Sequence, residues 1–303
     1  MTRRAEEVAH LASGIDLCYD TFGDRADPAL LLVMGLSGPL NWWNTELCGL
    51  LASAGFFVVR FDNRDVGRST ILDRAGGTRL DVVRAFAGLG RTPPYTISDL
   101  ADDALALMSH LDVRSAHVAG ASMGGMIAQT MAVEHQDRIR SLVSIMSTTG
   151  RRSVGWQDPR LFRNFLGKPP TGRDAYIARS AVVWEQIGSP GYRTPSDEVQ
   201  ARAGETYDRG ISASGSLRQT LAVLAQPDRT LKLRELRIPT LVIHGLSDRL
   251  VHVSGGRATA VAVPGAELML VPGMGHDLPR ALWGEFADGI IRTAARSETT
   301  QPR

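Results

Sequence analysis

Short runs of apolar residues, each bounded by turn residues, recur along most of the chain. Such runs are typical of strands that are buried on both faces, because helices cover both sides of a parallel sheet. They lie at residues 29–34, 55–61, 117–119, 139–146, 236–244 and 266–271. An alternating apolar and polar stretch at residues 14–22 predicts, in addition, the edge strand of a hairpin.

Helical patterns separate these runs. Apolar residues recur at helical spacing or in small-residue runs at 42–54, 98–111, 123–132 and 280–295. Ser98 is the expected N-cap of the second of these helices. The alternation of strand and helix predicts an α/β fold, with a doubly wound, mostly parallel sheet and right-handed crossovers.

The alternation stops between residues 148 and 228. That segment contains no buried strand, and its helical patterns are separated by Pro and Gly at 159–166, 173–187, 196–209 and 214–226. We expect an inserted helical cap, or lid, at 148–228 on an α/β core formed by 1–147 and 229–303. Residues 70–96 show no strong period, and the polar tail from Arg296 is expected to be disordered.

One turn carries a candidate nucleophile. Gly120, Ser122 and Gly124 have Gly-x-Ser-x-Gly spacing and lie between a predicted strand and a predicted helix. In a turn this tight, the residues two before and two after the serine must be small, because a Cβ would collide with neighbouring backbone. We therefore predict a nucleophile elbow with Ser122 at its tip, rather than a glycine-rich turn with a passive serine.

A serine hydroxyl needs a base to remove its proton, and the base needs an acid to orient it. His276 follows the last predicted strand, and Asp248 follows the strand that ends at His244. Both therefore lie at the carboxyl edge of the sheet, where open α/β sheets build their sites. We predict Ser122, Asp248 and His276 as nucleophile, acid and base. Among the rival acids, Asp62 and Asp65 are assigned to a structural turn, and Asp102 and Asp103 to a helix. Asp277 follows His276 directly, so its side chain is expected to point away from the imidazole.

Two backbone N–H groups are expected to stabilise the oxyanion that forms during acyl transfer. One belongs to Met123, which follows the serine, and the other to Leu36, in the loop after the strand at 29–34. Gly35 lets this loop approach the substrate closely. Aromatic residues that could line the substrate pocket are Trp43, Phe162, Phe165 and Trp184.

Composition excludes several other classes of function. The net charge is +2, so no strong field for nucleic acid or a membrane is expected. Neither a dinucleotide fingerprint nor a P-loop occurs, and no pair of histidines has zinc-ligand spacing, so neither cofactor nor metal is expected. The remaining histidines are assigned to core elements or flanking loops, and they are His110, His117, His135, His244 and His252.

Two features bear on location. Cys18 and Cys48 are expected to be free thiols rather than a disulfide, which fits a reducing compartment. The N-terminus lacks the apolar stretch of a signal peptide, and no run reaches transmembrane length. We expect a cytoplasmic monomer or homodimer.

The chain resembles the α/β-hydrolase-fold family across nearly its whole length. Its motifs are Leu-Val-Met-Gly at 32–35, Asp-Asn-Arg-Asp-Val-Gly-Arg-Ser at 62–69, Gly-Ala-Ser-Met-Gly-Gly at 120–125 and Pro-Gly-Met-Gly-His at 272–276. These details are most similar to the aclacinomycin methylesterase-like group, which hydrolyses carboxylic esters, including a methyl ester on a polyketide. The resemblance implies a triad of Ser122, Asp248 and His276 and an oxyanion hole of Leu36 and Met123. Many family members carry His where this chain has Met34.

The sequence thus predicts a serine hydrolase that cleaves small to medium carboxylic esters, which could be polyketide-like, through an acyl-enzyme. A cofactor-free haloperoxidase or perhydrolase and a lactonase are the enzymatic alternatives, because they share the elbow and the triad. The alternative from another class is a non-catalytic ligand receptor on the same fold. An aspartate nucleophile, as in dehalogenases or epoxide hydrolases of this fold, is disfavoured by the serine at the elbow.

Overall fold

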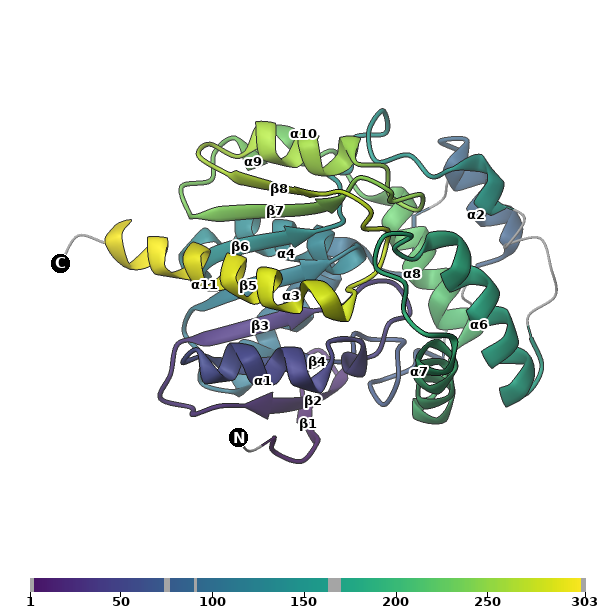
Figure 1. Ribbon diagram of the computed structural model, residues 1–303, viewed down its shortest axis with the longest axis horizontal. Helices are drawn as coiled ribbons and strands as arrows, with labels where there is room; N and C mark the ends of the chain where they lie inside the picture. The colour runs from purple at the N-terminus through teal and green to yellow at the C-terminus, as the bar shows by residue number, and fades with distance from the viewer. Residues whose placement is uncertain (1–2, 74–76, 90–91, 163–169, 301–303) are drawn as a thin grey trace.

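Eight strands form one mixed sheet at the centre of the protein (Figure 1). The structure is a computed structural model and describes residues 3–73, 77–89, 92–162 and 170–300. The strand order is β1-β2-β4-β3-β5-β6-β7-β8, with β1, β2 and β4 paired antiparallel and all later pairs parallel. The bounds are β1 Glu7–His10, β2 Asp16–Phe22, β3 Ala29–Val33, β4 Phe57–Phe61, β5 Ala116–Ala121, β6 Ile139–Ile145, β7 Thr240–Gly245 and β8 Glu267–Val271.

Helices cover both faces of the sheet, which confirms the predicted doubly wound architecture. Helices α1 (Thr45–Ser53) and α11 (Trp283–Thr300) pack together on one face, which is turned toward the viewer in Figure 1. The other face carries α3 (Ile97–His110), α4 (Met123–Glu134) and α10 (Ser254–Ala262), with the short α9 (Thr230–Leu233) beside α10. Single 3-10 turns lie at Leu40–Trp42, Gln136–Arg138 and Arg280–Leu282.

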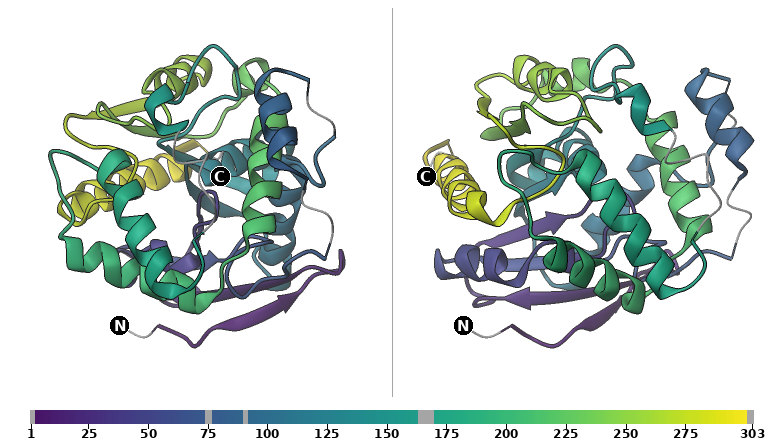
Figure 2. Two further views of the ribbon diagram at one scale, coloured as in Figure 1. Left: turned by 90° about the vertical axis from the view of Figure 1, so that its right-hand side faces the viewer. Right: turned by 45° about the vertical axis from the view of Figure 1, so that its right-hand side comes forward.

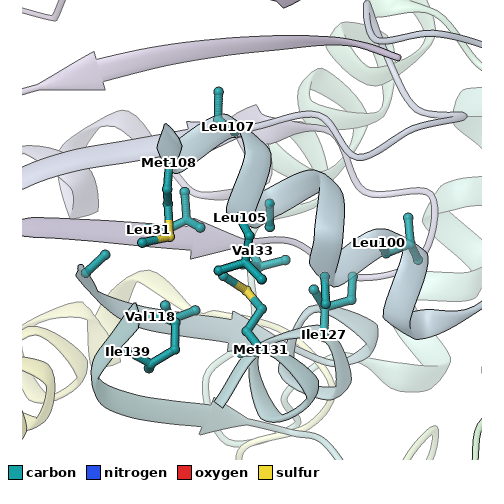
Figure 3. Packing of buried hydrophobic residues seen from close by; sticks show 14 of the residues in the cluster. Leu31, Val33, Leu100, Leu105, Leu107, Met108, Val118, Ile127, Met131 and Ile139 are labelled. Carbon is teal, nitrogen blue, oxygen red and sulfur yellow. The ribbon is translucent and has the colours of Figure 1, made fainter. Parts of the chain in front are cut away.

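The two faces have separate hydrophobic cores, and the central strands contribute to both. In β3, Leu31 and Val33 pack against α3 and α4, whereas Leu30 and Leu32 lie in the cluster of α1 and α11. Figure 3 shows Leu31 and Val33 beside Ile127, Met131 and residues of α3. Because successive side chains point to opposite faces, both faces must be apolar. This explains why the strand reads as one continuous apolar run.

The segment between β6 and β7 contains helices only, among its described residues. They are a 3-10 turn at Pro159–Phe162, α6 (Arg173–Ile187), α7 (Ser196–Arg209), α8 (Ala213–Ala225) and the short α9 described above. The longer helices lie at the end of the core toward which the parallel strands run (Figures 1 and 2). They therefore stand over the loops that carry the predicted site. The division into a core and a cap with boundaries at 147 and 229 stays a prediction.

Several sequence predictions are wrong in detail. The edge strand is β1, and the predicted strand at 14–22 is its inner neighbour β2; the polar composition of Glu7–His10 hides an edge strand. The N-cap of α3 is Thr96, which forms a capping box with Asp99, and Ser98 lies inside the helix. Helix α11 continues past Arg296 to Thr300.

An additional helix, α2 (Arg79–Phe86), lies in the segment that shows no period. It has a capping box of Thr78 and Asp81, but several of its apolar side chains are exposed and it packs against α8 rather than the sheet. Its sequence therefore lacks the apolar stripe of a core helix. As predicted, Cys18 and Cys48 are free thiols, and both are buried.

Candidate active site

The sharp turn between β5 and α4 places Ser122 at its tip. Ser122 has φ 57° and ψ −120°, a left-handed backbone conformation that residues other than glycine rarely adopt. Hydrogen bonds from neighbouring strands hold this conformation: the Ser122 N–H donates to the Ile145 carbonyl at 2.9 Å, and the Ser147 hydroxyl donates to the Ser122 carbonyl at 2.8 Å. The hydroxyl therefore stands on a rigid support at the carboxyl edge of the sheet.

The glycines around Ser122 are required by close backbone contacts. A Cβ at Gly120 would lie 2.1 Å from the Gly124 carbonyl oxygen, and a Cβ at Gly124 would lie 2.1 Å from the Val33 carbonyl oxygen. A Cβ at Gly35 would lie 3.0 Å from the Ser122 Cβ. The turn and the loop after β3 thus approach each other more closely than side chains would permit.

The structure brings Ser122, His276 and Asp248 into one chain of hydrogen bonds. The His276 Nε2 lies 2.9 Å from the Ser122 Oγ, and the His276 Nδ1 lies 2.7 Å from the Asp248 Oδ2. An ionised carboxylate at Nδ1 holds the ring proton there, which leaves Nε2 free to accept the serine proton. The imidazole and the carboxylate are both buried, so bulk water does not compete for the bond between them.

Asp248 is held as an anion by its surroundings. Its Oδ1 accepts hydrogen bonds from the backbone N–H groups of Leu250 and Val251, each at 2.9 Å. Burial by itself would raise the pKa of Asp248, but the charge of His276 and the hydrogen bonds from His244 and His276 lower this pKa to about 2. The carboxylate therefore stays ionised throughout the neutral pH range.

This ionisation predicts a pH-dependent contribution to stability. Above pH 4, Asp248 is charged in both the folded and the unfolded chain, and its interactions stabilise the fold by about 2 kcal/mol. As the pH falls from about 4 toward 2, the unfolded chain binds the proton first and this stabilisation is lost. The gap in unfolding free energy between the wild type and Asp248→Asn should therefore shrink by about 1 kcal/mol between pH 5 and pH 3. Urea titrations at the two pH values measure the gap, and an equal gap at both would contradict the assignment.

The loop that carries His276 is anchored to the inserted helical segment. The His276 N–H donates to the Ile187 carbonyl at 2.7 Å, and the Gly275 N–H donates to the Ser189 hydroxyl at 2.8 Å. Ser189 in turn hydrogen-bonds to the Asp277 carboxylate. The end of α6 and the residues that follow it therefore fix the loop on both sides of the imidazole.

The rival acids each make another contact. Asp62 pairs with Arg209 and accepts from the Leu40 N–H, while Asp65 pairs with Arg218. Asp103 pairs with Arg64, and Asp102 is exposed on α3. Together with the Asp277–Ser189 bond, these contacts leave Asp248 as the carboxylate beside the imidazole.

The two predicted oxyanion donors lie in the wall of one cavity together with Ser122. Met123 is the first residue of α4, so its N–H has no acceptor within the helix. Leu36 follows Gly35, which touches the serine. Both predicted donors therefore belong to residues that share a cavity wall with Ser122.

The loop after β3 is supported by residues far away in the sequence. The Ser37 N–H donates to the Gln219 Oε1 at 2.7 Å, and the Ser37 hydroxyl donates to Ser216 at 2.7 Å. On the core side, the Asn63 side chain donates to the Met34 carbonyl at 3.0 Å. Helix α8 and the turn after β4 thus hold the loop that begins at Met34.

A cavity of about 2240 Å³ opens above Ser122 between the core and the inserted helices. Trp184 and Gly35, two of the residues predicted to line a substrate pocket, lie in its wall. The prediction for Trp43 is wrong, because its side chain is fully buried in the core cluster of α1 and α11, and Trp42 lines the cavity instead. The side chain of Phe162 and the whole of Phe165 lie outside the described residues.

His244 contacts the loop that carries Asp248, and the sequence assigns no role to this histidine. Its buried ring lies with Nε2 2.8 Å from the Val251 carbonyl and 3.5 Å from the Asp248 Oδ2. Gly256 makes room for the ring, since a Cβ there would lie 2.5 Å from the Nδ1 of His244. His244 therefore helps to fix the loop that carries Asp248. Its position at the end of a strand, four residues before the acid, is the only sequence signal.

Two kinds of feature, metal-ligand clusters and membrane-spanning helices, are not found in the part of the chain that the structure describes. No group of three or more His, Cys, Asp or Glu side chains there could hold a metal ion. None of the helices at 3–73, 77–89, 92–162 and 170–300 combines the length and apolarity needed to cross a bilayer.

Comparison with known proteins gives one family and several distant relatives. A family model described as alpha/beta hydrolase fold matches residues 28–279. Rhodomycin D methylesterase DauP of Streptomyces sp. (strain C5) is 29% identical over 298 residues, covering 91% of this chain and 94% of that protein. The 3-oxoadipate enol-lactonase 2 of Acinetobacter baylyi is 27% identical over 250 residues, covering 81% of each chain.

Solved structures show the same fold. The enol-lactonase from Burkholderia xenovorans LB400 superposes with a TM-score of 0.71 at 23% sequence identity, covering 97% of this chain and 100% of that one. At this identity the likeness concerns the fold alone.

Proposed function

Because the chain belongs to the α/β hydrolase fold family, we propose that it hydrolyses carboxylic esters through a covalent acyl-enzyme on Ser122. The chain is an α/β hydrolase whose distant relatives include methylesterases and enol-lactonases. The observation that carries the finer proposal is the hydrogen-bonded series from the Ser122 Oγ through His276 to Asp248.

In the first half of the reaction, the Ser122 Oγ attacks the ester carbonyl carbon while the His276 Nε2 takes the hydroxyl proton. Asp248 stabilises the imidazolium that forms. The carbonyl oxygen becomes an oxyanion, which the N–H groups of Leu36 and Met123 bind. One such donor typically contributes about 10²- to 10³-fold in rate. The imidazolium then protonates the leaving alkoxide, and the alcohol departs.

In the second half, water replaces the alcohol. The neutral His276 removes a proton from the water, the resulting hydroxide equivalent attacks the acyl carbon, and the same two N–H groups bind the second oxyanion. Collapse of this intermediate returns the proton to the Ser122 Oγ and releases the carboxylic acid. Neither a metal nor an organic cofactor takes part in this proposed cycle.

The substrate is proposed to be a small-molecule ester bound in the cavity between the core and the helices at 148–228, which we propose to act as a cap. The volume of about 2240 Å³ accommodates more than a short-chain ester. A cyclic ester would be opened by the same steps, so lactone hydrolysis is the second candidate, favoured by the enol-lactonase relative.

Direct comparison of three reactions tests the proposal. Purified protein should hydrolyse short p-nitrophenyl esters, and this turnover should exceed peroxide-dependent bromination of a dye, because the site is proposed to carry an acyl group to water. The rate of lactone opening, measured by pH-stat and compared with the rate of ester hydrolysis, decides between an esterase and a lactonase. Dominant bromination would overturn the esterase proposal, and saturable ligand binding without any turnover would favour a receptor.

A further inference from the structure

An arginine without an anionic partner lies in the wall of the cavity. Arg202, in α7, places its guanidinium 4.4 Å from the ring centre of Trp184 and 5.9 Å from that of Trp42. The two indoles contact each other edge to face, with centroids 5.2 Å apart. The Trp42 Nε1 donates to the Thr206 Oγ1 at 2.9 Å, which fixes this indole against the next turn of α7.

Several other arginines of the described residues that are buried or half-buried have acceptors. Arg60 pairs with Asp20, Arg209 with Asp62 and Glu6, and Arg218 with Asp65. Arg229 lacks a carboxylate but is hydrogen-bonded to the Gln129 and Gln226 side chains and the Thr148 carbonyl. For Arg202, in contrast, no carboxylate of the described residues lies within ion-pair distance and none of their side chains accepts its hydrogen bonds.

The nearest negative charges do not neutralise Arg202. Asp277 and Glu198 act on it only through space, and Asp277 is already hydrogen-bonded to Ser189. Burial lowers the pKa of the Arg202 guanidinium, and these two carboxylates oppose that effect. A cation that is partly removed from water and lacks a hydrogen-bond acceptor is costly, and such groups concentrate at binding sites.

We propose that Arg202, which lies over the rings of Trp184 and Trp42, binds a carboxylate of the substrate at a distance from the scissile ester. A guanidinium presents parallel N–H donors in a plane, which match the two oxygens of a carboxylate. The cation–π contacts with the two indoles occupy no hydrogen-bond donor of the guanidinium. Asp277, which follows His276 directly, connects this subsite to the reaction centre. The inference rests on the proposed ester hydrolysis and specifies its substrate class, namely esters that carry a second, anionic group.

Matched substrates test the inference. The substrates are mono(4-nitrophenyl) esters of straight-chain dicarboxylic acids from adipate to sebacate, each compared with its ω-amide, which is neutral and of the same shape. For at least one chain length, the wild type should favour the carboxylate in kcat/KM by about 10- to 100-fold, the range expected for a charge-assisted hydrogen-bonded pair. In Arg202→Leu this ratio should fall to about one, mainly through KM, and Arg202→Lys should retain part of it because the charge remains without the planar fork.

Arg193 provides the control, because it lines the same cavity but is exposed to solvent. Arg193→Gln removes the same charge and should change the ratio by less than about threefold, since salt screens solvated charges. A wild type without preference for the carboxylate, or an Arg202→Leu variant that loses both substrates equally, would overturn the inference.

A binding measurement separates this inference from the proposed reaction. Titrating suberate into Ser122→Ala should change the tryptophan fluorescence saturably, because Trp42 and Trp184 flank the guanidinium, and Ser122→Ala/Arg202→Leu should lose the change. Saturable binding in a wild type that hydrolyses no ester would support the subsite and refute the esterase. Hydrolysis of the amide substrates without any suberate signal would refute the subsite alone.

Discussion

Replacing Ser122 with Ala should lower kcat for a p-nitrophenyl ester by about 10⁴- to 10⁶-fold, because the acyl-enzyme can no longer form and only the oxyanion donors remain to assist water. The backbone of the turn is held by the Ser122 N–H donating to the Ile145 carbonyl and by the Ser147 hydroxyl donating to the Ser122 carbonyl, and neither bond involves the Ser122 hydroxyl. The melting temperature should therefore change little. Steady-state kinetics and thermal unfolding measure both quantities.

A serine elsewhere on the surface provides the control. Ser98 lies half-buried on α3, where its hydroxyl donates to Glu134, and Ser98→Ala should keep wild-type turnover. A serine-directed organophosphate should add one adduct to Ser122, located by peptide mass spectrometry, and should leave Ser122→Ala unmodified. Full activity in Ser122→Ala, or an adduct on another residue, would refute the assignment of the nucleophile.

The second large effect concerns the attachment of α8 to the core. Arg218 and Asp65 are both fully buried and form a bidentate ion pair, with N–O distances of 2.8 and 2.7 Å. Arg218→Met should lower the unfolding free energy by about 3–5 kcal/mol, because it leaves the Asp65 carboxylate buried without its countercharge. This corresponds to a fall in melting temperature on the order of 10 °C.

An exposed pair with the same geometry is the matched control. Arg173 and Asp208 also form two bonds, at 2.8 and 2.9 Å, but both side chains are about half exposed. Arg173→Met should therefore be much less destabilising than Arg218→Met. In a double-mutant cycle, adding Asp65→Asn to Arg218→Met should cost less than the sum of the single changes. Equal losses at the buried and the exposed pair would show that burial of Asp65 is not the cause.

Local patterns in the sequence were sufficient to predict the sheet and the meeting of the three site residues. The apolar runs mark strands covered on both faces, and parallel strands bring the loops after β5, β7 and β8 to the same edge. Ser122, Asp248 and His276 follow those strands directly, so their proximity depends on topology rather than on details of packing. Gly120 and Gly124 mark the turn, because the local backbone leaves no space for a Cβ.

The parts that could not be predicted depend on contacts between distant segments. Whether Trp42 or Trp43 faces the cavity is decided by the 3-10 turn at Leu40–Trp42, for which apolar periodicity gives no signal. Gln219 supports the loop of Ser37 although it lies 182 residues away in the sequence, and no local motif predicts this contact. That Arg202 forms no ion pair with a carboxylate of the described residues can likewise be seen only when its neighbours in space are known.

The anchoring of the His276 loop by the end of α6 and the residues after it has a practical consequence for engineering. Exchanging residues 148–228 for the corresponding segment of a relative is an obvious way to transplant specificity. The donor segment would also have to supply the carbonyl of Ile187, the hydroxyl of Ser189 and the amide of Gln219, each of which steadies a loop of the recipient. We expect chimeras that keep these three groups to retain turnover, and chimeras that change only the residues facing the ligand to be the safest route to a new selectivity.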